Sequence, residues 1–104
     1  MNHLMQVAFS DLNYYLGARV LLAKIYYENG DEEPLISLLA AFTIFLKRNR
    51  EISADLKQTY LNFCDLLLRL VSRSPRKTAN LGDKIRETPL LTERKWLLAH
   101  WEEG

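Results

Sequence analysis

The residue types that most often carry catalysis or bind metals are scarce in this chain of 104 residues. His3 and His100 lie near opposite ends of the sequence, and neither has a second histidine four residues away, the spacing that lets one helix face bind zinc. Cys64 is the single cysteine and lies in a leucine-rich segment, where a thiol is typically a small buried hydrophobic group rather than a nucleophile. The sequence therefore predicts no catalytic, metal-binding or cofactor-binding site.

The carboxylates and glycines also have structural explanations. Asp31, Glu32 and Glu33 form an acidic run, but they precede a predicted helix, whose N-terminal dipole favours negative charge. The four glycines are isolated from one another and form no phosphate-binding loop. We therefore expect a protein that is not an enzyme and that needs no cofactor.

The first of two candidate groups for binding is basic. Its members lie at or just beyond the C-terminal ends of the second and third predicted helices. These two ends would lie at opposite ends of an antiparallel pair. Helix C-termini and a solvated loop explain this charge better than a nucleic-acid site does, and the net charge is only +1. Nucleic-acid binding therefore stays a second alternative. The group comprises Lys47, Arg48, Arg50, Arg69, Arg73, Arg76 and Lys77.

The second candidate group is aromatic. Tyrosine and tryptophan are enriched at protein interfaces, because they combine apolar area with a polar atom. Tyr27 stands off the main apolar stripe of its helix, so we expect it to line a groove that binds a protein or peptide. The alternative is that most of the aromatic residues belong to the core. The candidate partner-binding residues are Arg19, Tyr27, Trp96 and Trp101.

Composition limits the setting in which these residues act. Hydrophobic residues make up 48% of the chain and charged residues 26%, which is typical of a globular protein. The N-terminus lacks the charged segment and long apolar stretch of a secretory signal. The longest apolar run, residues 34–46, is shorter than the roughly 18 residues that indicate a membrane span. We expect a cytoplasmic protein that does not enter membranes.

Apolar residues recur at helical spacing and show no sustained period-two alternation, so we predict an all-α fold of four or five helices. A first helix spans residues 11–29, and residues 4–9 form either its tail or an extended arm. A second helix begins at 31–34 and ends in the basic residues 47–50; a third spans 53–72. A loop at 73–79 precedes a short helix at 80–87, and Thr88-Pro89 is expected to begin a last helix through Trp101.

Several of these helices are apolar around much of their circumference. The first helix has a second apolar stripe, which consists of Tyr14, Ala18, Leu21 and Ile25. We therefore expect neighbours on two sides of this helix. Ile36 and Ile44 widen the apolar stripe of the second helix. The predicted core comprises Leu16, Leu22, Ile25, Tyr26, Leu35, Leu39, Phe42, Leu56, Tyr60, Phe63, Leu67 and either Trp96 or Trp101.

Residues 12–50 resemble a tetratricopeptide repeat, which is a pair of antiparallel helices. The resemblance rests on the spacing of a large residue, a leucine and small-residue pair, an aromatic residue and a turn glycine. Leu35, Phe42 and Lys47 depart from the pattern, and a shift by one repeat length matches only Leu56 and Tyr60. The matching residues are Leu16, Leu22, Ala23, Tyr26 and Gly30.

The segments LLAKIYYENGDEEPLISLL, YLNFCDLLLRL and ETPLLTERKWLLAHWEE also resemble the C-terminal region of large uncharacterised bacterial helical-repeat proteins. This resemblance implies antiparallel helical hairpins from a right-handed α-solenoid, and no activity. We expect one domain, with a hairpin at 11–50, a long helix at 53–72 and capping helices at 80–103. The expected function is a non-catalytic interaction or scaffold module. The alternative is a structural solenoid end that associates with its parent chain or with a copy of itself.

Overall fold

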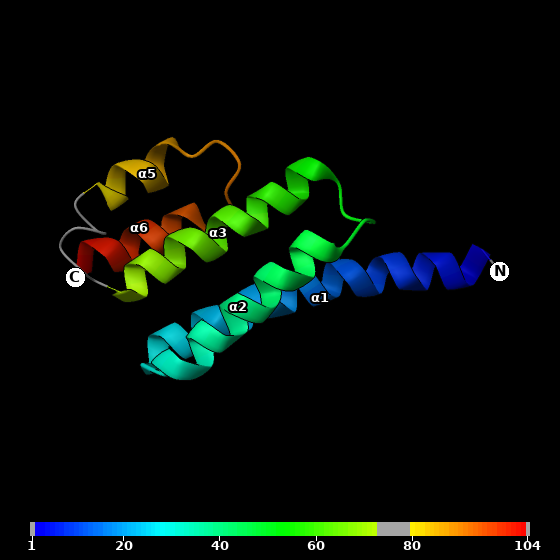
Figure 1. The fold of residues 1–104 in the computed structure, drawn as a ribbon, viewed down its shortest axis with the longest axis horizontal. Coiled ribbons are helices and arrows are strands. Elements are labelled where there is room, and N and C mark those ends of the chain that lie inside the picture. The colour runs from blue at the N-terminus through cyan, green and yellow to red at the C-terminus, as the bar shows by residue number, and fades with distance from the viewer. Residues whose placement is uncertain (1, 73–79, 104) are drawn as a thin grey trace. The chain divides into compact units, whose positions relative to one another are not determined.

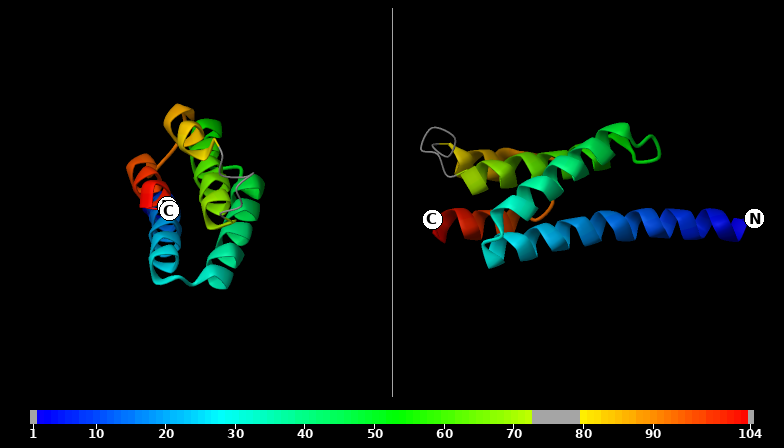
Figure 2. Two further views of the ribbon diagram at one scale, coloured as in Figure 1. Left: turned by 90° about the vertical axis from the view of Figure 1, so that its left-hand side faces the viewer. Right: turned by 60° about the horizontal axis from the view of Figure 1, so that its bottom comes forward.

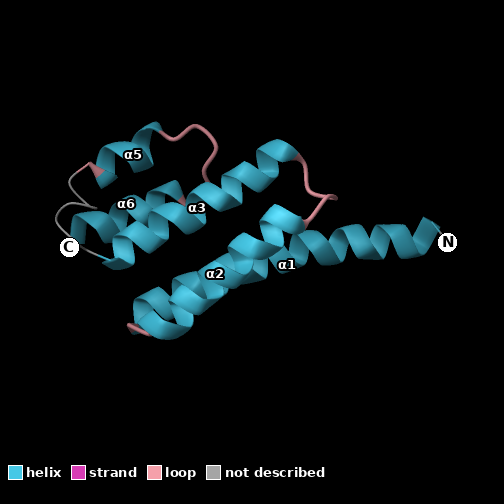
Figure 3. Cartoon of the chain, viewed as in Figure 1, coloured by secondary structure: helices cyan, strands magenta, loops and turns pink. Residues whose placement is uncertain are grey.

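The computed structural model describes residues 2–72 and 80–103, with side chains described from residue 11 onward. These residues form five α-helices and no strand, which confirms the all-α prediction (Figures 1 and 3). The predicted loop at 73–79 lies outside the described residues. The helices are α1 (Asn2–Asn29), α2 (Glu32–Arg48), α3 (Ala54–Ser72), α5 (Leu81–Glu87) and α6 (Arg94–Glu103).

The chain divides into two compact units, residues 1–38 and 39–104. The first unit contains α1 and the beginning of α2. The second contains the remainder of α2 together with α3, α5 and α6. No helix within the described ranges is both long enough and apolar enough to cross a membrane.

A glycine turn ends α1 and reverses the chain (Figure 1). Gly30 has a φ of 77°, a left-handed conformation that glycine reaches without a steric penalty. Its N–H donates to the Tyr27 carbonyl at 3.1 Å, and the Asp31 N–H donates to the Tyr26 carbonyl at 2.9 Å. The predicted end of the first helix is confirmed. At its other end, α1 begins at Asn2, so residues 4–9 are helical rather than an extended arm.

Hydrogen bonds of three polar side chains hold the connection between α2 and α3. The Asn49 side-chain oxygen accepts the N–H groups of Glu51 at 2.8 Å and Ile52 at 3.1 Å. The Lys57 ammonium donates to the Asn49 carbonyl at 2.7 Å. The Ser53 hydroxyl oxygen accepts the Leu56 N–H at 3.2 Å, which makes Ser53, the first residue of the helix predicted over 53–72, the N-cap of α3.

The prediction that Thr88-Pro89 begins the last helix is wrong. Thr88 instead ends α5, because its N–H and its hydroxyl both donate to the Lys84 carbonyl, at 3.0 and 2.6 Å. Pro89 lies in the connection that follows, and α6 begins only at Arg94 and continues to Glu103. A polar residue followed by proline suits the end of one helix as well as the beginning of the next.

Arg94 explains why this connection folds back on α5. Its guanidinium donates to the carbonyls of Ile85 at 2.7 Å, Arg86 at 2.9 Å and Pro89 at 3.4 Å. These bonds satisfy carbonyls that a helix C-terminus leaves without a partner. Glu93, with a φ of 61°, then accepts the Leu97 N–H at its carbonyl at 2.9 Å, which begins α6.

Helices α3, α5 and α6 contact one another in the second unit (Figures 1 and 2). The Asn62 amide on α3 donates to the Leu90 carbonyl at 2.8 Å and fixes the connection before α6. Gly82 on α5 lies directly against the indole of Trp101 on α6. The buried side chains from these three helices include Phe63, Leu67, Leu70, Leu81, Ile85 and Leu97.

Burial confirms half of the predicted core. Ile25 and Leu56 are exposed, so those predictions are wrong. Leu22, Tyr26, Tyr60 and both tryptophans are only partly buried. The predicted core residues that are buried are Leu16, Leu35, Leu39, Phe42, Phe63 and Leu67.

Candidate interaction surfaces

Several exposed apolar side chains of the first unit lie on one face of α1, which we call the α1 surface. It consists of Tyr14, Ala18, Leu21 and Ile25. Tyr14 is 80% exposed, Leu21 56% and Ile25 43%, and Ala18 is exposed between them. Their spacing of three or four residues places them on successive turns of one helix face. The expectation that this stripe is covered by a neighbour is therefore wrong for the single chain.

A different face of α1 is buried. Leu16 and Ala23 are each 1% exposed and Val20 is 6% exposed. The sequence shows both stripes, but apolar periodicity alone cannot tell which of them a neighbouring element covers. The burial of Leu16, Val20 and Ala23 leaves the α1 surface as the side of the helix that faces solvent.

A second exposed apolar face runs along α2, and we call it the α2 surface. It consists of Ile36, Ala40 and Ile44, spaced four residues apart. Ile36 is 44% exposed and Ile44 is 52% exposed, while Ala40 is also exposed. The prediction that Ile36 and Ile44 widen the buried stripe is therefore wrong, because the buried side of α2 is formed by Leu35, Leu38, Leu39, Phe42 and Leu46.

The predicted groove residues of α1 lie away from the α1 surface. The Arg19 guanidinium lies over the Tyr15 ring, 4.7 Å from its centroid, in a cation–π contact. Tyr27 is partly buried, and its position is about 150° around the helix from the mean direction of the α1 surface. Arg19 and Tyr27 thus lie about 80° apart around α1, and both lie outside its exposed apolar face.

The two tryptophans of α6 are partly buried and contact neighbouring side chains. The Trp96 ring lies 4.5 Å from the His100 ring, centroid to centroid. The Arg86 guanidinium lies over the Trp101 ring at 5.7 Å. Arg86 is also within 3.4 Å of Asp83 and 3.9 Å of Glu102. Trp101 therefore contributes to the packing between α5 and α6.

The described members of the basic group do not form one patch. Lys47 and Arg48 end α2, and Arg50 follows them before α3. Arg69 lies in the last turn of α3, roughly 22 Å along the helix from its first residue at 1.5 Å per residue. It pairs with Asp65 at 3.3 Å. The remaining members, Arg73, Arg76 and Lys77, lie outside the described residues.

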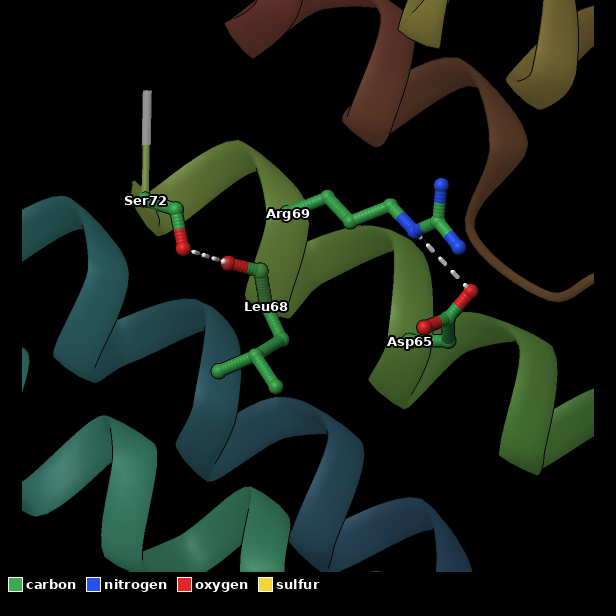
Figure 4. Close-up of a pocket in the computed structure, with 4 residues that line it drawn as sticks. All are labelled: Asp65, Leu68, Arg69 and Ser72. Atoms are coloured by element: carbon green, nitrogen blue, oxygen red, sulfur yellow. Dashed lines mark hydrogen bonds and ion pairs between the residues drawn. The ribbon is translucent and has the colours of Figure 1, made fainter. Parts of the chain in front are cut away.

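A shallow hollow of about 350 Å³ lies along the last turns of α3 (Figure 4). The described residues that line it are Asp65, Leu68, Arg69 and Ser72. Asp65 and Arg69 form the ion pair, and the Ser72 hydroxyl donates to the Leu68 carbonyl at 3.1 Å, as Figure 4 shows. The lining residues within the described part of the chain all come from α3.

Two side chains of the described residues have a perturbed pKa. Burial is the main cause that raises the pKa of the Cys64 thiol to about 12, so its nucleophilic thiolate form is strongly disfavoured near neutral pH. Burial, followed by the charge of Glu93, raises the pKa of Tyr60. The part of the chain that the structure describes contains no cluster of His, Cys, Asp or Glu suited to a metal ion.

The candidate residues named from the sequence and the exposed apolar residues found in the structure are different sets. The sequence does carry a signal for the exposed apolar residues. The α1 surface and the α2 surface each consist of apolar residues at helical spacing, and a charged residue lies three positions beyond each end of both. Comparison of the chain with protein-family models, with curated proteins and with solved structures finds no match.

Proposed function

We propose that this chain is a non-catalytic protein-interaction module whose α1 surface binds an apolar segment of another protein. One exposed apolar side chain would need no explanation, because folded proteins expose many of them. Here Tyr14, Leu21 and Ile25 are exposed along a single face about 17 Å long, measured at 1.5 Å per residue. A continuous apolar face of this kind is typical of a protein-binding site. This face is the observation that carries the proposal.

The charges beside the α1 surface favour a partner other than a second copy. Asp11 lies three residues before Tyr14, and Glu28 lies three residues after Ile25. Pairing of two α1 surfaces, in either direction, would therefore bring acidic residues together, which opposes association. A partner with apolar residues flanked by lysine or arginine would complement both features. Tyr14 suits the role of an anchor at one end of the surface, since tyrosine contributes strongly to protein interfaces.

The tetratricopeptide-like spacing around Leu16, Ala23 and Gly30 supports the same class of function. We therefore include a repeat-type scaffold in the proposal, together with a cytoplasmic location. The groove residues Arg19 and Tyr27 stay candidates for contacts away from the α1 surface.

Site-specific photocrosslinking tests the proposal. A photoreactive amino acid placed at Leu21, in cells that make the chain naturally, should give adducts with one or a few proteins. Asn13 is a matched control because it is exposed on α1 but points about 110° away from the mean direction of the α1 surface. Binding of the purified partner should then weaken with Ile25→Ser and not with Asn13→Ser. Identical adducts from Leu21 and Asn13 would contradict the proposal.

A purely structural role through self-association is the second candidate function, and the α2 surface favours it. Nucleic-acid binding has less support, because Arg69 is paired with Asp65 and lies far from Lys47 and Arg48 along the chain. Fluorescence anisotropy with single- and double-stranded oligonucleotides checks this third function. Binding that weakens steeply as salt rises would support it.

A further inference from the structure

The α2 surface has a charge pattern that differs from that of the α1 surface. Glu33 lies three residues before Ile36, and Lys47 lies three residues after Ile44, and both charged residues are exposed. Since α2 is one uninterrupted helix, its own geometry fixes these directions. At 100° per residue, Glu33, Ile36, Ile44 and Lys47 all lie within about 40° of the direction of Ala40. The surface is therefore an apolar stripe with an acidic and a basic end.

This stripe is symmetric about Ala40. Ile36 and Ile44 lie four residues on either side of it, and Glu33 and Lys47 lie seven residues on either side. When two such helices run antiparallel about a two-fold axis at Ala40, each residue meets the one at the same distance on the other side. Ile36 then meets Ile44 of the second copy, and Glu33 meets Lys47 of the second copy.

We propose that a second copy of this chain covers the α2 surface, in an antiparallel α2–α2 pair with a two-fold axis at Ala40. A two-fold interface needs one self-complementary patch, and the α2 surface meets this requirement in both shape and charge. The alanine on the axis has a short side chain, so the two helices can approach closely there. The inference deepens the second candidate function, self-association, and it concerns a different surface and a different partner from the α1 proposal.

The charges also select the direction of pairing. In a parallel pair, Glu33 would meet Glu33 of the second copy, and Lys47 would meet Lys47, so both ends would repel. In the antiparallel pair, two symmetry-related Glu33–Lys47 contacts form instead. Such charge complementarity sets orientation and partner choice.

The size of the α2 surface limits the expected affinity of the dimer. Each copy contributes two isoleucines and one alanine, with Ser37 and Thr43 at the sides. Such a contact is smaller than the interfaces of stable dimers and belongs to the weak, transient class. We expect a monomer at low micromolar concentration and a growing dimer fraction toward millimolar concentration.

Charge reversal tests the pairing by sedimentation equilibrium over this concentration range. Glu33→Lys or Lys47→Glu alone should weaken dimerisation by about tenfold, because each replaces two attractive contacts with two repulsive ones. The double variant Glu33→Lys/Lys47→Glu should restore dimerisation to within about threefold of the original, because the two charges are exchanged. Glu51→Lys is a matched control, since Glu51 is exposed and lies outside α2.

The double variant separates pairing from helix stability. Both reversals oppose the α2 dipole, so helix loss would make the double variant worse than either single variant. Restored dimerisation therefore supports the pairing. A dimer constant that is unchanged in both single variants overturns it, as does a double variant weaker than either single variant. So does a chain that stays monomeric at millimolar concentration.

Crosslinking tests the position of the two-fold axis in a Cys64→Ala background. Ala40→Cys should link to itself through a short bismaleimide, whereas Ala41→Cys should not, because Ala41 is exposed but points about 100° away. A mixture of Ile36→Cys and Ile44→Cys chains should link more than either chain alone. Equal linking at positions 40 and 41 overturns the proposed axis. Leu21→Ser should leave the dimer constant unchanged, so the α1 and α2 proposals can fail separately.

Discussion

Replacing Gly82 by alanine tests how closely α5 and α6 pack. A Cβ atom at this position would lie 2.6 Å from Cη2, 2.7 Å from Cζ3 and 2.9 Å from Cζ2 of Trp101. Carbon atoms in contact prefer separations of about 3.5–4.0 Å, so the indole would have to move by roughly 1 Å. The Arg86 guanidinium over the indole and the Arg86–Glu102 ion pair oppose that movement.

Two opposing effects set the magnitude of this change. Overpacking of a well-filled contact costs about 1–3 kcal/mol. Alanine in place of glycine within a helix stabilises it by about 0.5–1 kcal/mol. The clash outweighs the gain in helix propensity, so Gly82→Ala should lower the free energy of unfolding by about 0.5–2 kcal/mol. In a chain of this size, each kcal/mol corresponds to a Tm change of about 4–8 °C.

Urea unfolding followed by circular dichroism measures this free energy. Gly17→Ala is the matched control: Gly17 is also helical, but nothing lies within 4 Å of its added Cβ, so this variant should be stabilised. In a Trp101→Leu background the indole is absent, and Gly82→Ala should become neutral or stabilising. Equal destabilisation by Gly82→Ala in both backgrounds would refute the packing explanation.

Three further changes test other contacts, each by urea unfolding. Arg94→Met removes hydrogen bonds to three carbonyls and should cost about 1–3 kcal/mol, whereas a loss below about 0.5 kcal/mol would show that water replaces them. Asn49→Ala removes the acceptor for two N–H groups and should cost about 1 kcal/mol; an unchanged midpoint would contradict this. The raised pKa of Cys64 means that the unfolded chain loses this proton first, so stability should fall from pH 9.0 toward about 12. Tyr60 adds a decrease of the same sign, so Cys64→Ala should reduce the slope without removing it, and an unchanged slope would exclude Cys64 as its cause.

The sequence predicts the elements whose ends depend on local chemistry. Asn29-Gly30 and Ser53 are recognisable because a left-handed glycine and a capping serine act within a few residues of their own positions. Thr88-Pro89 gives a wrong start for the last helix, because the path of the chain after α5 depends on Arg94. The Arg94 guanidinium donates to carbonyls five to nine residues earlier. A side chain that folds back in this way leaves no local pattern beside the residues it stabilises.

The candidate surfaces show the same limit. The exposed residues of the two surfaces are as apolar as the buried leucines, so periodicity predicts that neighbouring helices cover them. These residues include Leu21, Ile25, Ile36 and Ile44. Which apolar face is covered depends on neighbouring elements, and that information enters only with the tertiary structure. The charges that flank each face, in contrast, can be read from the sequence once the exposed faces are known.

Flanking charge gives the two exposed surfaces different partners even though both are apolar. The α1 surface is acidic beyond both ends, at Asp11 and Glu28, so every self-pairing opposes like charges. The α2 surface carries Glu33 at one end and Lys47 at the other, so antiparallel self-pairing joins opposite charges. Reversing Lys47 alone would give α2 the pattern of α1, and reversing Glu28 alone would give α1 the pattern of α2. If end charge decides partner choice, Lys47→Glu weakens dimerisation through α2 by about tenfold, while Glu28→Lys permits weak pairing through α1 that photocrosslinking at Leu21 detects as a homodimer.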